Sequence, residues 1–256
     1  MTKEQNDIIR LKRVRLLRSK EELERLPKGK LLINTLNAFS YNNARGDRAF
    51  AEALAKGDVL IPDGMSVVKA CQWLKNPEAP KERVAGWDLF MHEMRKLNEL
   101  LPLETSIHHA ERRVLFFGSS ERVLELIRER AAREYPNLKV ITYSPPYRKE
   151  FSEEESRAMI DFINAAKPDL MWVGMTAPKQ EKWTYRHWEE MDVGCHVGTI
   201  GAVFDFYAGT TKRAPVWWQQ HGIEWLYRLI KEPRRMWRRY IIGNMEFLWY
   251  VLRERF

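Results

Sequence analysis

Asp63, Arg83 and Gln180 are the side chains of this sequence whose types and positions best suit chemistry. Asp63 lies in a Pro-Asp-Gly turn after a short apolar run, where its carboxylate could accept a proton from a substrate hydroxyl. The Arg83 guanidinium could bind phosphate oxygens in pairs, and the Gln180 amide could orient a polar ligand. Each also has an ordinary structural interpretation: a turn, a surface ion pair, or a polar residue near a helix start. Taken singly, they leave the reaction open.

The residue patterns that usually hold a metal ion or a cofactor are missing. The sequence has no D-x-D, Cys71 and Cys195 have no CxxC spacing, and His196 lies in an apolar run typical of a core histidine. The turn Gly118-Ser119-Ser120 could hold a phosphate or simply cap a helix, and it matches neither GxGxxG nor GxxxxGK. We therefore predict no metal and no cofactor. The two isolated cysteines favour a reducing cytoplasm.

Short apolar runs alternate with longer amphipathic ones, and this alternation predicts the elements that must position these side chains. The expected strands are residues 30–36, 59–61, 114–118, 139–143, 170–174 and 193–200. The expected helices are residues 47–56, 65–74, 87–100, 121–134, 153–167 and 179–191. The pattern predicts an α/β fold, a mostly parallel sheet flanked by helices. Because such sheets bind ligands beyond the carboxyl ends of their strands, the loops after the strands should line one cleft.

Residues 212–256 differ in composition from the rest of the chain. They carry ten Lys/Arg and four Asp/Glu, which is +6 of the net charge of +8, and five of the ten tryptophans. We predict a core of residues 1–211 and a helical, basic and aromatic appendage of residues 212–256. This composition suits nucleic acid, an anionic membrane surface, or a basic helical hairpin packed on the core. No stretch reaches the ~18–20 apolar residues that span a bilayer, and the charged N-terminus does not fit a secretory signal.

Several motifs, taken together and in order, resemble the WecG/TagA/CpsF glycosyltransferases, which elongate undecaprenyl-diphosphate-linked sugars in bacterial surface polysaccharide synthesis. The similarity covers nearly the whole chain from about residue 30. In the core the motifs are NTLN (34–37), PDG (62–64), RVAGWD (83–88), SPPY (144–147), VGMTAPKQEKW (173–183) and GAVFDFYAG (201–209). In the appendage they are RAP (213–215), GIEWLYRL (222–229), EP (232–233) and RRY (238–240). Met65 and the pair Met175-Thr176 depart from the family's usual residues, which bears on sugar specificity more than on the reaction.

The resemblance implies a Rossmann-like core of the type called GT-E and a mobile C-terminal appendage, residues 212–256, that completes the active site at the membrane. It also implies a metal-independent, inverting transfer from a UDP-sugar to a sugar on undecaprenyl diphosphate. It implies that Asp63 is the catalytic base. The residues it implies for donor binding are Thr35, Asn37, Arg83, Gln180 and Asp205. Those suited to binding diphosphate or membrane are Arg213, Arg228, Arg235, Arg238 and Arg239. The last three would share a helix face, because their spacing is i, i+3, i+4.

The expected protein is a peripheral enzyme on the cytoplasmic face of the bacterial cell membrane. Its partners would be the UDP-sugar, the polyprenyl-linked acceptor and an anionic lipid surface, to which each basic side chain contributes about 1 kcal/mol. Two rivals are a nucleic-acid-binding protein that uses the Arg/Trp tail and a nucleotide-binding regulator without activity. Which sugar is moved (N-acetylmannosamine, its uronic acid or glucose), the first sugar of the acceptor and whether the chain forms a homo-oligomer all stay open.

Overall fold

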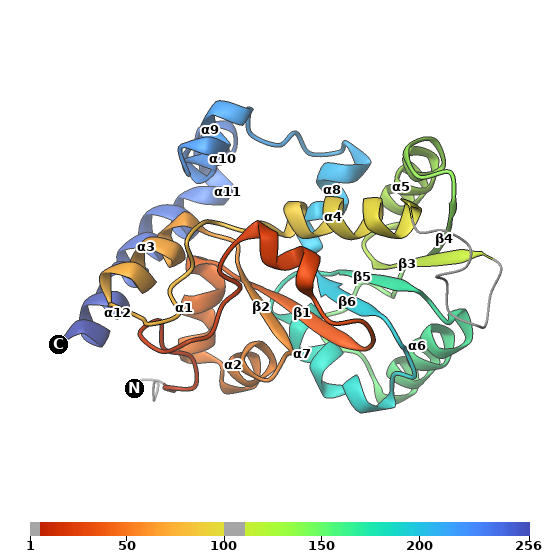
Figure 1. Ribbon diagram of the computed structural model, residues 1–256, viewed down its shortest axis with the longest axis horizontal. Helices are drawn as coiled ribbons and strands as arrows, with labels where there is room; N and C mark the ends of the chain where they lie inside the picture. Colours follow the sequence, from red (N-terminus) through yellow and green to blue (C-terminus); the bar gives the residue numbers. More distant parts are fainter. Residues whose placement is uncertain (1–5, 100–110) are drawn as a thin grey trace.

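The computed structural model describes residues 6–99 and 111–256, and its centre is a sheet of six parallel strands in the order β2-β1-β6-β5-β3-β4 (Figure 1). The strands are β1 (Leu31–Leu36), β2 (Val59–Pro62), β3 (Arg112–Gly118), β4 (Leu138–Tyr143), β5 (Leu170–Gly174) and β6 (His196–Thr199). Each lies on a strand expected from the sequence, and every pairing between neighbours is parallel. The predicted fold class is confirmed.

Helices connect the strands. They are α1 (Ala38–Gly46), α2 (Arg48–Ala55), α3 (Met65–Trp73), α4 (Gly86–Glu99), α5 (Glu121–Glu134), α6 (Glu153–Ala166), α7 (Lys179–Arg186) and α8 (Gly201–Ala208). Two short 3-10 helices are η1 (Lys20–Arg25) and η3 (Trp188–Glu190). The apolar periodicity did not predict α1 or α8. The first depends on a capping box between Asn37 and Ser40, and the second is apolar on most of its surface, so neither shows an amphipathic pattern.

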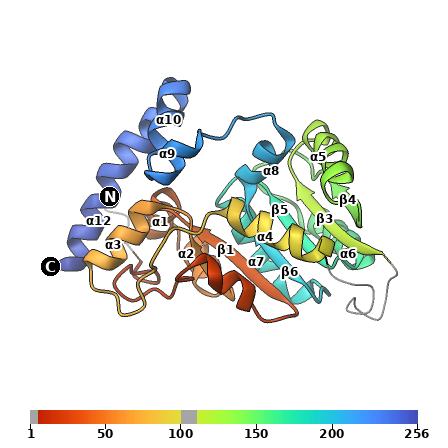
Figure 2. The same cartoon turned by 45° about the horizontal axis from the view of Figure 1, so that its top comes forward.

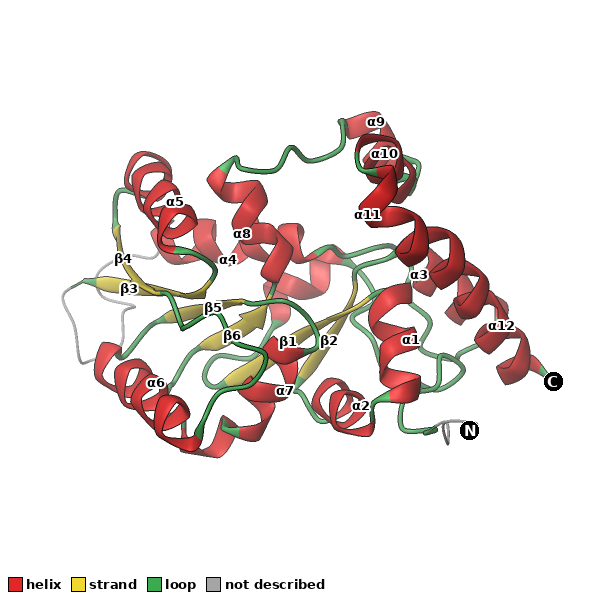
Figure 3. Ribbon diagram, turned by 180° about the vertical axis from the view of Figure 1, so that it is seen from behind, coloured by secondary structure: helices red, strands yellow, loops and turns green. Residues whose placement is uncertain are grey.

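Successive side chains of each strand point to opposite faces of the sheet, and this divides the core into two layers. Phe116 and Trp172 pack on one face with residues of α4, α5 and α8. Leu115 and Phe117 pack on the other face with residues of α6 and α7. Figure 3 shows these two groups of helices on either side of the strands. Helices therefore cover both faces of the sheet, and a ligand can approach it only at the ends of the strands.

The tail consists of short helices that end in a longer one. They are α9 (Val216–Gln220), α10 (Glu224–Lys231), α11 (Pro233–Trp237), the π-helical turn η4 (Arg238–Ile242) and α12 (Gly243–Arg255). Figure 2 shows the long connection that leads from α8 to α9 and α10. Pro233 opens α11, as the sequence predicts, because proline fits the first turn of a helix. Among the helices described, none is both apolar and long enough to cross a membrane.

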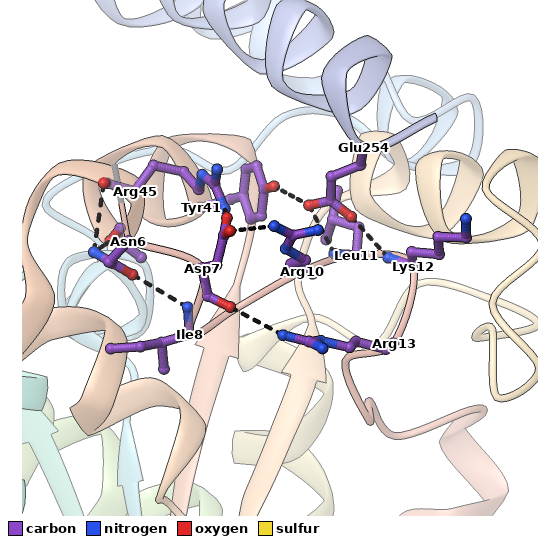
Figure 4. Close-up of polar contacts among 11 residues, drawn as sticks. Asn6, Asp7, Ile8, Arg10, Leu11, Lys12, Arg13, Tyr41, Arg45 and Glu254 are labelled. Atoms are coloured by element: carbon purple, nitrogen blue, oxygen red, sulfur yellow. Dashed lines mark hydrogen bonds and ion pairs between the residues drawn. The ribbon is translucent and has the colours of Figure 1, made fainter. Parts of the chain in front are cut away.

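Helix α12 packs into the core and does not stand apart from it. Its residues Phe247, Tyr250 and Val251 are buried in one hydrophobic cluster with residues of α1, α2, α3 and the N-terminal segment. Glu254 accepts hydrogen bonds from the Leu11 and Lys12 amides at 3.1 and 2.9 Å and from the Tyr41 hydroxyl (Figure 4). A domain boundary after residue 211 stays a prediction, but a cut there would divide a shared hydrophobic cluster.

Replacing Phe247 by alanine tests the contribution of α12 to the core. Phe247 is 7% exposed and lies edge-on against the Tyr41 ring, so its loss leaves a cavity. We expect Phe247→Ala to lower the free energy of unfolding by about 3–5 kcal/mol in denaturant titrations. Met245→Ala is the matched control on the same helix, because Met245 is 66% exposed. Equal effects of the two substitutions would show that α12 does not belong to the core.

Candidate active site

The loops that follow the strands meet in one cleft at the carboxyl edge of the sheet, as the sequence predicts. The cleft has a volume of about 2290 Å³ and is lined by loops from the core together with residues of the tail. Typical small-molecule sites occupy ~300–1,000 Å³, so this cleft has room for two ligands side by side. Core and tail both contribute side chains to its wall.

Asp63 and Arg83 lie together in this cleft, with Glu224 of α10 on the far side of the arginine. The Asp63 amide donates to the Leu36 carbonyl of β1 at 2.9 Å, which holds the aspartate at the end of two neighbouring strands. Arg83 Nη2 lies 3.6 Å from Asp63 Oδ1, and Arg83 Nη1 lies 2.5 Å from Glu224 Oε2. The guanidinium therefore lies between two carboxylates, and one of them comes from the tail.

The electrostatic surroundings of Asp63 suit a proton acceptor. Burial raises the pKa of the Asp63 carboxyl above its ordinary value, and the negative charge of Glu224 adds to the rise. The charges of Arg83 and Arg228 and a hydrogen bond from the Gly86 amide lower it. A general base works best when its pKa is close to the working pH, and a raised carboxyl pKa moves in that direction.

The structure brings all five predicted donor-binding residues into the cleft wall: Thr35, Asn37, Arg83, Gln180 and Asp205. Asn37 and Gln180 are among those whose side chains already make hydrogen bonds within the chain. The Asn37 carboxamide oxygen caps α1 by accepting from the Ser40 amide at 3.0 Å. Gln180 Oε1 accepts from the Met175 amide at 3.1 Å. Both residues thus shape loops of the cleft, and their contact with a ligand stays a prediction.

Two of the predicted tail arginines, Arg213 and Arg228, line the cleft. The Arg213 guanidinium is 5.3 Å from the centre of the Trp87 ring, and its Nε is 3.5 Å from Glu224 Oε1. The Arg228 guanidinium is 4.8 Å from the centre of the Phe206 ring. Both line the cleft, so their positive charge faces the space where an anionic ligand would bind.

Arg238 and Arg239, two of the three tail arginines predicted to share a helix face, have different surroundings, and a face shared with Arg235 stays a prediction. Arg239 lines the cleft with its guanidinium 4.2 Å from the centre of the Phe39 ring. Arg238 is exposed and lies over the Trp237 ring, and it is not part of the cleft wall. The two arginines are consecutive residues of the π-helical turn η4, where successive side chains point in different directions, and only Arg239 reaches the cleft. The Arg235 side chain lies outside the described part of the structure.

Sequence reasoning missed Glu181 and Glu224, two buried carboxylates in the cleft wall. Glu181 Oε1 accepts from Gln180 Nε2 at 2.9 Å, whereas its Oε2 has no hydrogen-bond partner among the residues described. Burial raises the pKa of Glu181 to about 7, and the Gln180 bond offsets only part of this rise. Both glutamates belong to motifs quoted above, but no local pattern shows that a carboxylate becomes buried.

The described residues contain no group of three or more His, Cys, Asp or Glu side chains that could hold a metal ion. The cations that act on Asp63 are the guanidinium groups of Arg83 and Arg228, and such groups bind phosphate oxygens through directed pairs of hydrogen bonds. The arrangement can therefore hold a diphosphate by its arginines and take a proton with Asp63.

Comparison with known proteins agrees with this chemistry. The family model described as Glycosyl transferase WecG/TagA/CpsF family matches residues 9–256. The chain belongs to this family. It is thus a glycosyltransferase, and the site described above is the candidate active site of a WecG/TagA/CpsF enzyme.

Several curated relatives of this WecG/TagA/CpsF chain carry the name N-acetylglucosaminyldiphosphoundecaprenol N-acetyl-beta-D-mannosaminyltransferase. The relative from Bacillus spizizenii is 30% identical over 190 residues, which are 74% of this chain and 66% of the relative. The relative from Bacillus subtilis is 29% identical over 223 residues, 87% of this chain and 79% of the relative. The relative from Staphylococcus aureus strain MW2 is 30% identical over 206 residues, 80% and 74% of the two chains.

Glu181 should make the stability of the protein depend on pH. Its pKa of about 7 in the folded chain exceeds the ordinary value of 4.5, so the folded state binds more protons between these two values. The free energy of unfolding therefore falls as the pH rises through that interval, by about 3 kcal/mol. We expect Glu181→Gln to remove this fall in denaturant titrations at pH 4.5 to 7. Glu125→Gln, an exposed position on α5, should leave it in place.

Proposed function

We propose that this protein transfers a sugar from a UDP-sugar to a sugar carried on undecaprenyl diphosphate, with inversion and without a metal ion. The observation that carries the proposal is the cluster of Asp63, Arg83, Arg213 and Arg228 in one wall of the cleft. It combines a proton acceptor with three cations suited to a diphosphate. Family membership supports the same reaction class.

In the proposed reaction an acceptor hydroxyl attacks the anomeric carbon of the donor sugar from the side opposite to the diphosphate. A bond forms between the acceptor oxygen and this carbon, the bond from the carbon to the diphosphate oxygen breaks, and UDP leaves with the electron pair. Asp63 takes the hydroxyl proton. Arg83, Arg213 and Arg228 stabilise the negative charge that develops on the departing diphosphate, the role that a metal ion fills in other enzymes.

The names of the relatives indicate the substrates to test first. They are named for transfer of N-acetylmannosamine to N-acetylglucosaminyl-diphosphoundecaprenol. We propose the same pair of sugars here, with UDP-N-acetylmannosamine as the donor. A volume of about 2290 Å³ is large enough for the donor together with the sugar and diphosphate of the acceptor.

We also propose that the protein works at the cytoplasmic face of the cell membrane, where its tail attaches to anionic lipid. The tail exposes large apolar side chains on several helices, namely Val216, Trp217, Ile230, Trp237, Ile241, Ile242, Met245, Leu248, Trp249 and Leu252. Arginines lie among them: Arg238 covers the Trp237 ring and Arg253 the Trp249 ring. Aromatic rings at headgroup level and cations beside anionic lipid are the usual means of reversible attachment.

Replacing Asp63 by asparagine tests the base. The substitution keeps the shape of the side chain and removes its ability to take a proton, so UDP release from UDP-N-acetylmannosamine with a short-chain acceptor should fall by roughly 10²- to 10⁴-fold. UDP binding measured by calorimetry should stay within a few fold of the unsubstituted protein.

Asp161→Asn, an exposed position on α6, is the matched control and should leave the rate unchanged. The same assay in EDTA should give the unsubstituted rate, since no step uses a metal. Near-normal turnover by Asp63→Asn would overturn the assignment of the base, and loss of activity in EDTA that Mg²⁺ restores would overturn the metal-independent mechanism.

Vesicle binding tests the proposed membrane surface. The double substitution Trp237→Ala/Trp249→Ala removes two exposed rings, and we expect it to weaken binding to anionic vesicles by roughly tenfold or more. Binding of the unsubstituted protein should also weaken as salt rises. Tyr147→Ala, an exposed ring in the loop after β4, should bind vesicles normally. Unchanged binding by the double variant, or tighter binding to RNA than to vesicles, would contradict the proposal.

A further inference from the structure

Glu224 is the one carboxylate of the tail that reaches the cluster around Asp63 in the described structure. It is the first residue of α10, and its side chain is only 10% exposed. One oxygen, Oε2, lies 2.5 Å from Arg83 Nη1 of the core. The other, Oε1, lies 3.5 Å from Arg213 Nε in the connection that precedes α9. The two oxygens of a single carboxylate thus face guanidinium groups from two different parts of the chain.

Burying the Glu224 carboxylate carries a desolvation cost. A buried carboxylate loses its hydration, and its attraction to cations roughly offsets that loss only when the geometry is good. Glu224 also lies where its charge opposes an incoming diphosphate, because Arg83 and Arg213 are two of the three arginines suited to bind the diphosphate. A neutral or apolar residue at position 224 would avoid both costs. Packing of α10 against the core therefore does not by itself explain a carboxylate at position 224.

We propose that Glu224 is a positioning residue which couples the docking of the tail to the catalytic centre, an inference that rests on the proposed function. It holds Arg83 by a close ion pair and Arg213 by a longer one of 3.5 Å, and so keeps two of the three cations of the proposed diphosphate site in place. The new element is the residue: Glu224 is the side chain through which α10 contacts the arginines of the site.

The proposed coupling extends to Asp63. The groups that face this carboxyl are Arg83 before α4, Glu224 and Arg228 on α10, and the Gly86 amide at the start of α4. The Glu224 charge raises the pKa of Asp63, whereas the Arg83 and Arg228 charges lower it. A tail that docks with its glutamate in place therefore sets both the position of Arg83 and the proton affinity of the base.

Two substitutions at position 224 distinguish the effect of the Glu224 charge from the effect of its side-chain length. Glu224→Gln removes the charge and keeps the length, so the acid limb of the kcat/KM profile against pH should move to lower pH by about half a unit or more. Glu224→Asp keeps the charge but shortens the side chain. It should leave the limb near its original pH and lower kcat by roughly 10- to 100-fold through misplacement of the arginines.

Glu246→Gln is the matched control, because Glu246 lies in the same tail, on α12, outside the cleft wall. It should change neither the limb nor kcat. A role of Glu224 confined to stability would lower the free energy of unfolding and leave the limb in place in both position-224 variants. That result, or an equal shift of the acid limb in Glu224→Gln and Glu224→Asp, would overturn the proposal.

Hydrogen exchange gives a measurement that does not depend on the reaction. In the full-length protein, Glu224→Ala should raise the exchange rates of the α10 amides by about tenfold or more, while the strands keep their protection. Unchanged exchange in α10 would overturn the coupling even if the enzyme is active. If the unsubstituted protein releases no UDP but Glu224→Ala frees α10, the proposed function fails and the docking role of Glu224 stands.

Discussion

The parallel direction of all six strands is the constraint on which the rest of this structure depends. It sends every loop that follows a strand to the same edge of the sheet, so Asp63 after β2 lies beside residues that follow β1, β5 and β6. The bond from the Asp63 amide to the Leu36 carbonyl makes this direct, because it joins the ends of two adjacent parallel strands. Helices cover both faces, and the carboxyl edge is the place left for chemistry.

The charged side chains of the cleft wall also depend on one another. In the cleft wall the largely buried Arg83 side chain lies between the carboxylates of Asp63 and Glu224, with Arg213 on the other side of Glu224. Each charge is kept in place by its neighbours, since an uncompensated charge at such a site is expensive. This mutual dependence means that the position of α10 and the electrostatics of Asp63 change together.

The tail has a part that packs in the core and a part that is exposed, and the amino-acid composition of residues 212–256 does not distinguish them. Helix α12 buries Phe247, Tyr250 and Val251 in the core and ties Glu254 to the N-terminal segment, so this part is structural. Along α9 to η4 and on the outer side of α12, apolar side chains and arginines are exposed. The tail is held to the core through α12, lines the cleft with residues of α10 and η4, and exposes apolar side chains on its outer side.

The sequence by itself determined the strands, most of the helices, the parallel sheet and the single cleft lined by the loops that follow the strands, in which Asp63, Arg83 and Gln180 lie. These follow from local periodicity and from the chemistry of residues at turns. Helices α1 and α8 escaped because a capping box and an all-round apolar surface do not produce an amphipathic period. Only the tertiary structure decided that Glu224 pairs with Arg83, that Glu181 is buried, and that Arg239 and Arg238 separate. The reason is physical: an ion pair between residues far apart in the chain, and the burial that shifts a carboxyl pKa, depend on which elements pack together and have no local pattern in the sequence.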